Sequence, residues 1–449
     1  MLTSLGTYAR NYFVLVGLQL TFVYPNLAQV HTIIDGELIG MTKSADPAEV
    51  CTFTLVESVP ENLTYSPTDP RLMSTYAAHK RLLERAKKSI HLSTFYWSLL
   101  GSDTPVSDYS ASQGADIFQT LLAVVKAGVV DVKIVQNSTY NDTEKLASAG
   151  AQVRTIDFQR LLKSGVMHTK MWIVDDMHAY LGSCNFDWRS YSQIKETGVL
   201  IENCPSLVSD AAKIFEVYWY LSDDSRPQIP SQWPANYSTD INATSPQTVY
   251  YNQSKGLVYL SSSPPPFCPD GRTKDLDAIV NVIRAANKFI YIAVMDYLPL
   301  TIYTRPEKFW PFIDDELRRA AFERHVSVYL MASRWDHTKY EMYPFLRSLN
   351  SLKGQMDVQV KLFTVPSTPE EKRIPYARVS HSKYMVTDQH AYIGTSNWSG
   401  DYFISTAGVG FVLQEPDDGL QNSNTLREQL TAVFLRDWHS NYTEYVRSN

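Results

Sequence analysis

The fold is decided by the stretch Val166-Met-His-Thr-Lys-Met-Trp-Ile-Val-Asp175, because the chain carries its pattern twice. The second copy, Val379-Ser-His-Ser-Lys-Tyr-Met-Val-Thr-Asp388, is displaced by 213 residues. The segment His178–Asn185 recurs as His390–Asn397 with a displacement of 212. Both copies therefore read H-x-K-x-x-x-x-D followed by G-[ST]-x-N, and a repeat of this kind predicts a duplicated half.

The two halves also share an order of helix and strand patterns. In the first half a helical pattern at 75–88 precedes apolar, β-branched runs at 91–97, 129–135 and 153–158. In the second half a helical pattern at 275–287 precedes such runs at 290–295, 326–331 and 358–365. Alternating helices and buried strands predict an α/β fold of two pseudo-symmetric α/β/α sandwich lobes.

We expect an N-terminal lobe at 45–245 and a C-terminal lobe at 255–449, meeting so that both motifs face one cleft. A polar, turn-rich stretch at 223–256 predicts a linker or surface excursion between them. The nearby run Ser261–Pro266 is not expected to form an inner strand, because proline donates no backbone hydrogen bond. The alternative is two separate tandem domains, each with half a site.

The motif residues suit the cleavage of a phosphodiester. In an extended strand His168 and Lys170 project from one face, and so do His381 and Lys383. One neutral imidazole attacks phosphorus, and the other protonates the leaving alkoxide and then activates water. The phosphate-binding residues are predicted to be the two histidines and two lysines together with Asn185 and Asn397. This scheme requires no metal and no cofactor.

The acidic residues Asp175, Asp388 and Glu196 are not expected to contact the phosphate. Asp175 and Asp388 complete the predicted catalytic set of His168, Lys170, His381 and Lys383. We interpret both aspartates as residues that surround the site or form turns and so order it, since a carboxylate repels a phosphate. Glu196 is predicted to orient His168 by accepting its second N–H. The corresponding position in the second half is interpreted as Thr406, so the two histidines are expected to be unequal. We assign His168 as the nucleophile and His381 as the acid.

Composition and targeting signals indicate a compartment. The net charge of −6 argues against a protein that coats duplex nucleic acid. Residues 1–34, with an apolar run at 12–24, predict a signal peptide or a short signal anchor and entry into the secretory pathway. Sequons at Asn62, Asn137, Asn141, Asn236, Asn242, Asn252 and Asn441 are predicted glycosylation sites. The sequon at Asn397 is predicted to be unoccupied, because the motif needs this side chain at the phosphate.

The four cysteines, Cys51, Cys184, Cys204 and Cys268, lack C-x-x-C spacing, which argues against zinc. One or two disulfides are expected, and spacing alone leaves their pairing open. The aromatic segments Phe95–Trp97 and Asp296–Tyr297 follow strands and are interpreted either as channel walls that stack a base or as core.

The paired motifs resemble the phospholipase D superfamily, and the chain from about Cys51 onward resembles its non-classical animal members. The resemblance also covers Gly182–Ser190, Phe309–Asp315, Arg373–Arg378 and His381–Phe403. It implies a luminal, membrane-tethered lysosomal 5′-exonuclease that releases 3′-mononucleotides from single-stranded DNA and RNA. It also implies a Cys51–Cys204 disulfide and a free thiol at Cys184.

Three functions remain open at this point. The first is the 5′-exonuclease, working in an acidic lumen of the endoplasmic reticulum or lysosome. The second is a phospholipase D-type lipid hydrolase or transphosphatidylase, and the third is a binding protein with a vestigial site. Complete motifs in both halves count against the third. The sequence also leaves open a homodimer and a membrane anchor.

Overall fold

The structure is a computed structural model of the chain. It describes four strands between residues 12 and 41, and then residues 49–102, 104, 109–226, 228–252, 254–415 and 424–447. The chain forms two compact units, Met1–Ala48 and Glu49–Asn449.

The first unit contains an antiparallel sheet in the order β1-β2-β3-β4. Its strands are β1 (Tyr12–Val16), β2 (Gln19–Val23), β3 (Val30–Ile34) and β4 (Glu37–Met41). The apolar run 12–24, which we expect to be part of a signal peptide or anchor, therefore coincides with β1 and β2. Residues 17, 18 and 24 of this run lie outside the described residues. Among the described helices, none has both the length and the apolar character needed to span a bilayer.

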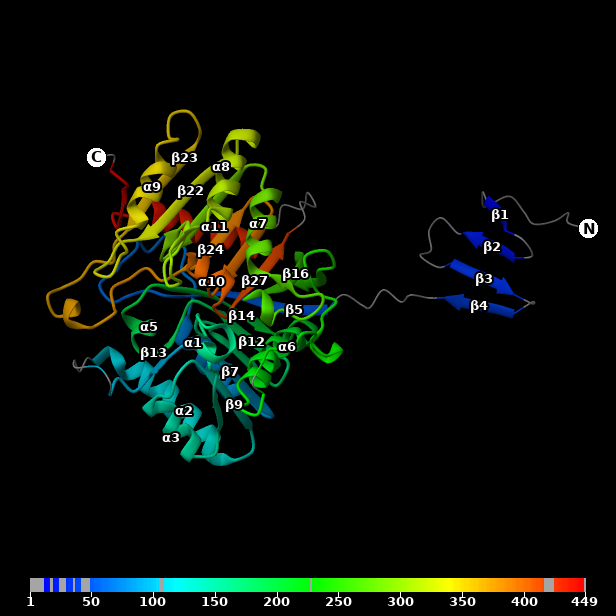
Figure 1. The fold of residues 1–449 in the computed structure, drawn as a ribbon, viewed down its shortest axis with the longest axis horizontal. Coiled ribbons are helices and arrows are strands. Elements are labelled where there is room, and N and C mark those ends of the chain that lie inside the picture. Colours follow the sequence, from blue (N-terminus) through cyan, green and yellow to red (C-terminus); the bar gives the residue numbers. More distant parts are fainter. Residues whose placement is uncertain are drawn as a thin grey trace, which may run out of the picture. The chain divides into compact units, whose positions relative to one another are not determined.

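Most strands of the second unit pair into one closed barrel, which contains two sheets with the same strand order, one from each half (Figure 1). The first sheet runs β10 (Gln152–Thr155), β9 (Asp131–Gln136), β7 (Ser89–Ser93), β11 (Met171–Val174), β12 (His178–Gly182), β14 (Glu196–Glu202), β5 (Glu49–Ser58). The second runs β23 (Val358–Phe363), β22 (Ser327–Ser333), β18 (Phe289–Val294), β24 (Lys383–Thr387), β25 (His390–Gly394), β27 (Gly408–Gln414), β16 (Ser254–Ser263). In each sheet the first three strands are parallel and the remaining neighbours antiparallel, which confirms the duplication.

Helices cover both sheets. Those of the first half are α1 (Thr75–Arg85), α2 (Ser112–Ala127), α3 (Asn141–Ser148), α4 (Phe158–Leu162), α5 (Arg189–Ser192) and α6 (Pro205–Leu221). Those of the second half are α7 (Asp275–Ala285), α8 (Phe312–Arg324), α9 (Met342–Asn350), α10 (Gly400–Ile404) and α11 (Leu426–His439). Short sequences fix their starts. Ser74 caps α1 by accepting from Ala77 N–H at 3.1 Å, and Thr425 with Glu428 forms a capping box at α11.

One hydrophobic core joins the two halves. It combines α6 and α11 with residues of both sheets, such as Phe53 and Ile173 of the first and Phe411 and Ile393 of the second. Separate cores lie under α1 and α2 in one half and under α7, α8 and α9 in the other. Figure 1 shows α2 at one end of this unit and α8 and α9 at the other. A shared core means that the halves are not tandem domains, so that alternative is wrong.

Shorter elements complete the unit. The short strands are β6 (Met73–Ser74), β8 (Trp97–Ser98), β13 (Phe186–Asp187), β15 (Gln247–Tyr251), β17 (Thr273–Lys274), β19 (Tyr297–Leu298), β20 (Leu300–Thr301), β21 (Lys308–Phe309), β26 (Trp398–Ser399) and β28 (Thr443–Tyr445). The 3-10 turns are η1 (Tyr109–Ala111), η2 (Ala235–Tyr237), η3 (Pro265–Phe267) and η4 (Glu371–Arg373).

Two expectations about the middle of the chain need correction. The expected linker 223–256 contributes β15, which pairs with β5 of the first half and β16 of the second and so connects the two sheets. The run Ser261–Pro266 divides in two. Its serines lie in β16 and pair with β27, and Ser261 and Ser262 also pair with β17. Only the prolines lack the N–H, and they lead into η3 after the strand ends.

Buried ion pairs also connect the halves. Lys195, just before β14, lies 2.7 Å from Asp437 of α11. Arg436 of α11 lies 2.7 Å from Glu57 of β5. All four side chains are buried, so losing one partner would leave an uncompensated charge in the core. These pairs fix how the two sheets meet at the site.

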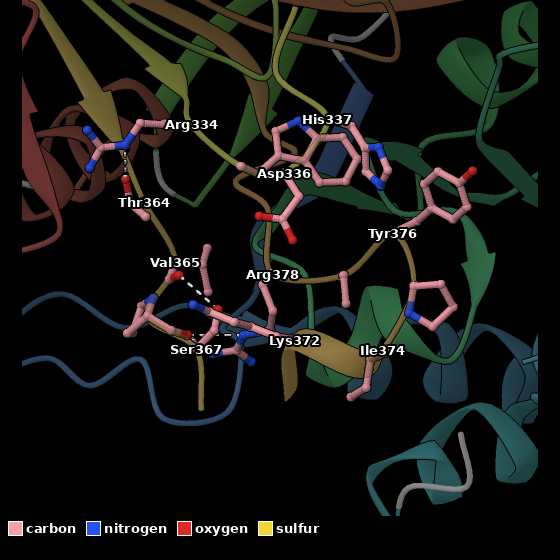
Figure 2. A pocket seen from close by; sticks show the side chains of 14 residues that line it. Arg334, Asp336, His337, Thr364, Val365, Ser367, Lys372, Ile374, Tyr376 and Arg378 are labelled. Carbon is pink, nitrogen blue, oxygen red and sulfur yellow. Dashed lines mark hydrogen bonds between the residues drawn. The ribbon is translucent and has the colours of Figure 1, made fainter. Parts of the chain in front are cut away.

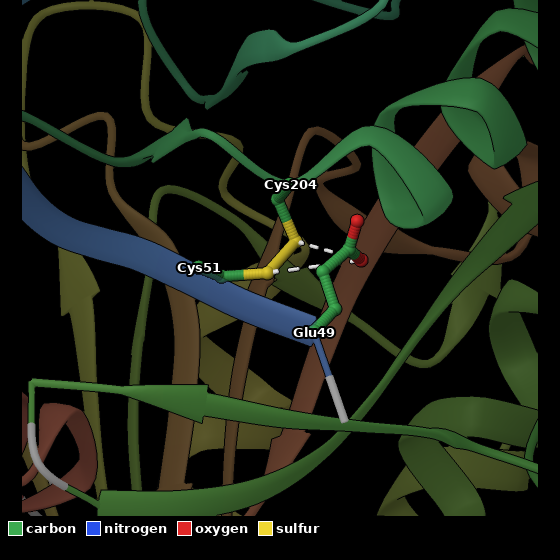
Figure 3. A group of neighbouring side chains, drawn as sticks. All are labelled: Glu49, Cys51 and Cys204. Carbon is green, nitrogen blue, oxygen red and sulfur yellow. Dashed lines mark hydrogen bonds between the residues drawn. A yellow bond between two sulfur atoms is a disulfide. The ribbon is translucent and has the colours of Figure 1, made fainter. Parts of the chain in front are cut away.

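The predicted disulfide is confirmed (Figure 3). Cys51 of β5 and Cys204, which precedes α6, are bonded across 153 residues of sequence. The carboxylate of Glu49 lies beside the two sulfurs, and the three side chains form a cluster of potential metal ligands. Because both cysteines are oxidised, neither offers a thiolate to a metal. Cys184 is a buried free thiol, as predicted.

Removing this disulfide is expected to destabilise the protein. A bond that closes so long a loop restricts the unfolded chain strongly, and typical losses are about 2–5 kcal/mol. Cys51→Ser should therefore lower the denaturant midpoint of unfolding clearly. The matched control is Cys268→Ser, since Cys268 is a free thiol, and it should leave the midpoint nearly unchanged. Equal midpoints for both variants would contradict the expected role of the disulfide.

Candidate active site

Each motif histidine is held by the opposite half of the molecule. The backbone N–H of His168 donates to the carbonyl of Ala407 at 3.0 Å, and that of His381 donates to the carbonyl of Lys195 at 2.7 Å. The histidines lie just ahead of the central strands, since β11 begins at Met171 and β24 at Lys383. The strand expected from Val166 onward is thus shorter, and contacts between the halves replace its first pairings.

The side chains around His168 alternate as predicted. Met167 and Met171 lie in the core shared by the halves, and Thr169 contacts the hydroxyl of Tyr218 on α6 at 3.1 Å. His168 faces the other way, into a cavity of about 610 Å³. His381 lines the same cavity. The structure thereby brings together the two histidines that lie 213 residues apart.

The same cavity contains both predicted asparagines. Asn185 and Asn397 line it, and Asn397 donates from Nδ2 to the Tyr402 hydroxyl at 3.0 Å. Within the described part of the chain, the buried Oδ1 atoms of both asparagines have no hydrogen-bond partner. Asn397 is only 2% exposed, which is consistent with the prediction that its sequon stays empty.

The two lysines lie behind the cavity wall. Lys170 Nζ donates to the carbonyl of His168 at 2.6 Å, and Lys383 Nζ donates to that of His381 at 2.7 Å. Both side chains are completely buried, and Lys170 Nζ lies 5.2 Å from the ring centre of Phe95. Each ammonium has further N–H bonds to direct at an anion. Direct contact of the lysines with phosphate stays a prediction.

Glu196 contacts His381, whereas the sequence predicted a contact with His168. Its Oε2 lies 2.9 Å from His381 Nδ1, and its Oε1 accepts from the Ser190 hydroxyl at 2.9 Å. The Nδ1 of His168 instead lies 2.9 Å from the carbonyl oxygen of Thr395. The prediction that Glu196 orients His168 is therefore wrong, because the glutamate reaches across to the other half.

The residue of the second half that corresponds to Glu196 is also not Thr406, which the sequence suggested. Gly182 pairs with Gly198 in the first sheet, and Gly394 pairs with Gly410 in the second. Counting back two residues aligns Glu196 with Gly408, and not with Thr406. A Cβ at Gly408 would lie 2.2 Å from Ser396 Oγ, so packing leaves no room for a carboxylate there.

Burial and charge make the two imidazoles electrostatically unequal. Burial lowers the pKa of His168 well below its ordinary value, and Lys170 and Lys383 lower it further. Burial lowers the pKa of His381 to about 4, while Glu196 acts against this shift. Burial alone would raise the pKa of Glu196, but the nearby His381 and Lys383 lower it, so its carboxylate stays ionised. His381 is thus the imidazole whose protonated form a neighbouring carboxylate stabilises.

The motif aspartates lie away from the cavity and have the predicted turn role. The Asp175 carboxylate accepts from the backbone N–H groups of residues 87–89, and that of Asp388 accepts from those of residues 287 and 288. Neither lines the cavity of the histidines. Each therefore fixes the loop that leads into a central strand, β7 in the first half and β18 in the second, and a catalytic contact is not observed.

Aromatic side chains form much of the cavity wall. Phe95 and Tyr402 both contact His168, each with its ring centre 4.9 Å from the imidazole. The other aromatic residues of the wall are Tyr96, Tyr140, Tyr303, Trp335 and Tyr376. Only the segment 95–97 was singled out from the sequence. Tyr376 and Tyr402 lie five residues before His381 and five after Asn397, whereas Tyr140, Tyr303 and Trp335 lie farther from the motifs in sequence.

The paired strands and the cavity between two duplicated halves define the phospholipase D superfamily. The family model described as "PLD3/4, PLD-like domain" matches residues 66–368, and the chain belongs to this family. It is 45% identical to the human "5'-3' exonuclease PLD3" over 418 residues, covering 91% of this chain and 84% of the relative. It is 41% identical to the mouse "5'-3' exonuclease PLD4" over 402 residues, covering 87% and 79% respectively.

A solved structure agrees on the fold. Phosphatidylserine synthase from Haemophilus influenzae matches with a TM-score of 0.54 at 13% identity, covering 82% of this chain and 85% of that one. This likeness concerns the fold alone. The resemblance inferred from the motifs is thus confirmed at the level of the PLD3/4 family.

Proposed function

We propose that the chain is a 5′–3′ exonuclease that cleaves single-stranded DNA or RNA through a phosphohistidine and releases 3′-mononucleotides. The observation that carries this proposal is the single cavity in which both motif histidines meet aromatic side chains from both halves. The relatives named as 5′–3′ exonucleases support the direction of cleavage.

His168 is the nucleophile in this proposal. A carbonyl oxygen only accepts hydrogen bonds, so the contact with Thr395 assigns the proton to Nδ1. The Nε2 lone pair is then free to attack phosphorus. In the first step the Nε2–P bond forms and the bond from phosphorus to the 5′-oxygen of the second nucleotide breaks.

His381 acts as the acid and then as the base. Its imidazolium donates a proton to the departing 5′-oxygen, while the ionised Glu196 stabilises the positive charge. The neutral imidazole then takes a proton from water, whose oxygen attacks phosphorus. The P–N bond breaks, and the first nucleotide leaves with a 3′-phosphate.

The remaining groups hold the phosphate. Asn185 and Asn397 direct amide groups at the cavity, and the two lysine ammoniums add positive charge behind it. Burial lowers the pKa of Lys383 to about 7, so its positive charge is retained below neutral pH and lost as the pH rises through that value. An acidic compartment therefore favours phosphate binding.

Aromatic walls favour nucleic acid over lipid as the substrate. Bases stack on aromatic rings irrespective of sequence, whereas acyl chains gain nothing specific from tyrosine hydroxyls. Tyrosine supplies five of the seven aromatic side chains on the cavity wall: Tyr96, Tyr140, Tyr303, Tyr376 and Tyr402. The lipid reaction is therefore the alternative that the experiment must exclude.

A luminal location follows as part of the proposal. The disulfide suits an oxidising compartment, and the predicted sequons other than Asn397 lie at positions with at least partly exposed side chains. Low luminal pH agrees with the acid requirement of His381. A membrane anchor within residues 1–34 and a homodimer stay predictions.

The test compares two substrate classes at about pH 5. The chain should release 3′-mononucleotides one at a time from the 5′ end of a single-stranded oligonucleotide labelled at its 3′ end. It should not hydrolyse phosphatidylcholine or phosphatidylglycerol vesicles at a comparable rate. Lipid hydrolysis without nucleotide release would overturn the exonuclease proposal in favour of the lipid enzyme.

A further inference from the structure

A second cavity adjoins the catalytic one. Its volume is about 320 Å³, and it is formed by the segments 334–337, 364–367 and 372–378 of the second half (Figure 2). Trp335, Pro375 and Tyr376 line both cavities. A chain that leaves the catalytic cavity past these residues therefore enters the second one directly.

The shared boundary carries an exposed aromatic stack. The rings of His337 and Tyr376 are stacked with centres 4.7 Å apart and planes 21° apart, and Trp335 meets His337 edge-on at 4.8 Å. Tyr376 is 62% exposed and has a φ of 56°, a backbone conformation that a bulky residue rarely adopts. A strained, exposed ring beside a cavity is suited to stacking on a planar ligand.

Lys372 is the cation of the second cavity that is available to a ligand. Arg334 pairs with Glu444, and Arg378 lies 3.3 Å from Glu371, so both arginines are held by carboxylates. Lys372 is exposed and makes no ion pair within the described part of the chain. Asp336 points into the same hollow (Figure 2), where its carboxylate can accept from an amino group on the edge of a base.

The proposed reaction determines which part of the substrate lies in the second cavity. In an in-line displacement the leaving oxygen lies on the far side of phosphorus from the nucleophile, and so it lies near His381. The segment 372–378 leads directly along the chain to Val379 and His381, which line the catalytic cavity. The second cavity thus lies on the leaving-group side.

We propose that this second cavity binds the second nucleotide of the strand, the one that leaves with its 5′-oxygen. Its base stacks on the His337–Tyr376 pair, and the phosphate that follows it meets Lys372. This inference rests on the proposed exonuclease function and adds a downstream subsite to it. Since stacking does not depend on base identity, the subsite supports cleavage of any sequence.

A change in the substrate tests the subsite most directly. An abasic unit at the second position of an octathymidylate should lower kcat/KM of the unchanged protein roughly 5- to 150-fold, the usual effect of losing one stacked base. An abasic unit at the sixth position serves as the control. In His337→Ala the abasic substitution at position two should lose most of its effect, because the stack is already incomplete.

A chromogenic ester separates the subsite from the catalytic cavity. Thymidine 3′-(4-nitrophenyl phosphate) has no second nucleotide, so His337→Ala and Lys372→Glu should turn it over at the unchanged rate. Both variants should be about tenfold or more slower on the octathymidylate. Lys126→Glu, which alters an exposed lysine at the end of α2, is the matched control for charge.

The outcomes distinguish the two proposals. Octathymidylate cleavage that is equally fast in the variants and the unchanged protein would overturn the subsite, and so would an equal loss on both substrates. If the unchanged protein hydrolyses the chromogenic ester but no oligonucleotide, the exonuclease function itself fails.

Discussion

His381→Ala will turn over thymidine 3′-(4-nitrophenyl phosphate) once rapidly and then only very slowly. Nitrophenolate is a good leaving group and needs no acid, so His168 still forms the adduct. Hydrolysis of the adduct then lacks its general base, and steady-state turnover should fall by about 10² to 10⁴. A burst of about one nitrophenolate per protein chain, followed by mass mapping of the phosphorylated histidine, provides the measurement.

His168→Ala serves as the companion to this experiment. It should give neither a burst nor an adduct, because no other imidazole occupies the position of the nucleophile. Both variants should unfold near the same midpoint as the unchanged protein, which shows that chemistry and not folding is lost. Recovery of the adduct on His381 in the unchanged protein would reverse the assignment of the two histidines.

Glu196→Gln will lower oligonucleotide cleavage by about 100-fold at pH 5. An adjacent carboxylate changes the pKa of a neighbouring group by about 1–3 units, so the amide lowers the pKa of His381 further. Acid catalysis needs protonated His381 and is lost as the pH rises through its pKa. The profile of kcat/KM against pH should therefore move to lower pH in the variant.

Two comparisons make the glutamate experiment specific. Formation of the adduct from the nitrophenyl ester should be nearly unchanged in Glu196→Gln, because that step requires no acid. Thr406→Ala alters the residue that the sequence suggested as the counterpart of Glu196, and it should leave the pH profile in place. Superimposable profiles for Glu196→Gln and the unchanged protein would refute the proposed support of His381.

The sequence predicted the fold well because both halves of the chain carry the same pattern of motifs, helices and strands. The repeated spacing located the histidines, and the alternation of Met167, Thr169 and Met171 against His168 showed which face is buried. Family resemblance added the pairing of Cys51 with Cys204. These features depend on neighbours in sequence or on a repeated pattern, and both are visible in a single chain.

The partner of Glu196 could not be predicted in the same way. The contact with His381 crosses between the halves, and nothing in the local sequence encodes how the halves meet. The counterpart was misplaced by two residues, because Gly198 was aligned with Gly408, whereas strand pairing and the displacement of 212 residues both match Gly198 with Gly410. The aromatic wall was missed for a related reason, since Tyr303, Trp335 and Tyr376 meet only in three dimensions.

The difference between Glu196 and Gly408 has a consequence for symmetry. Two identical halves related by a twofold axis would give both histidines the same neighbour, and neither would be predisposed to attack or to donate. A single chain that contains both halves is free of this restriction, so one copy keeps the carboxylate while the other keeps a glycine too crowded to replace. Covalent linkage of the copies thus allows the two histidines to differ before any substrate binds, which identical subunits related by a twofold axis cannot do.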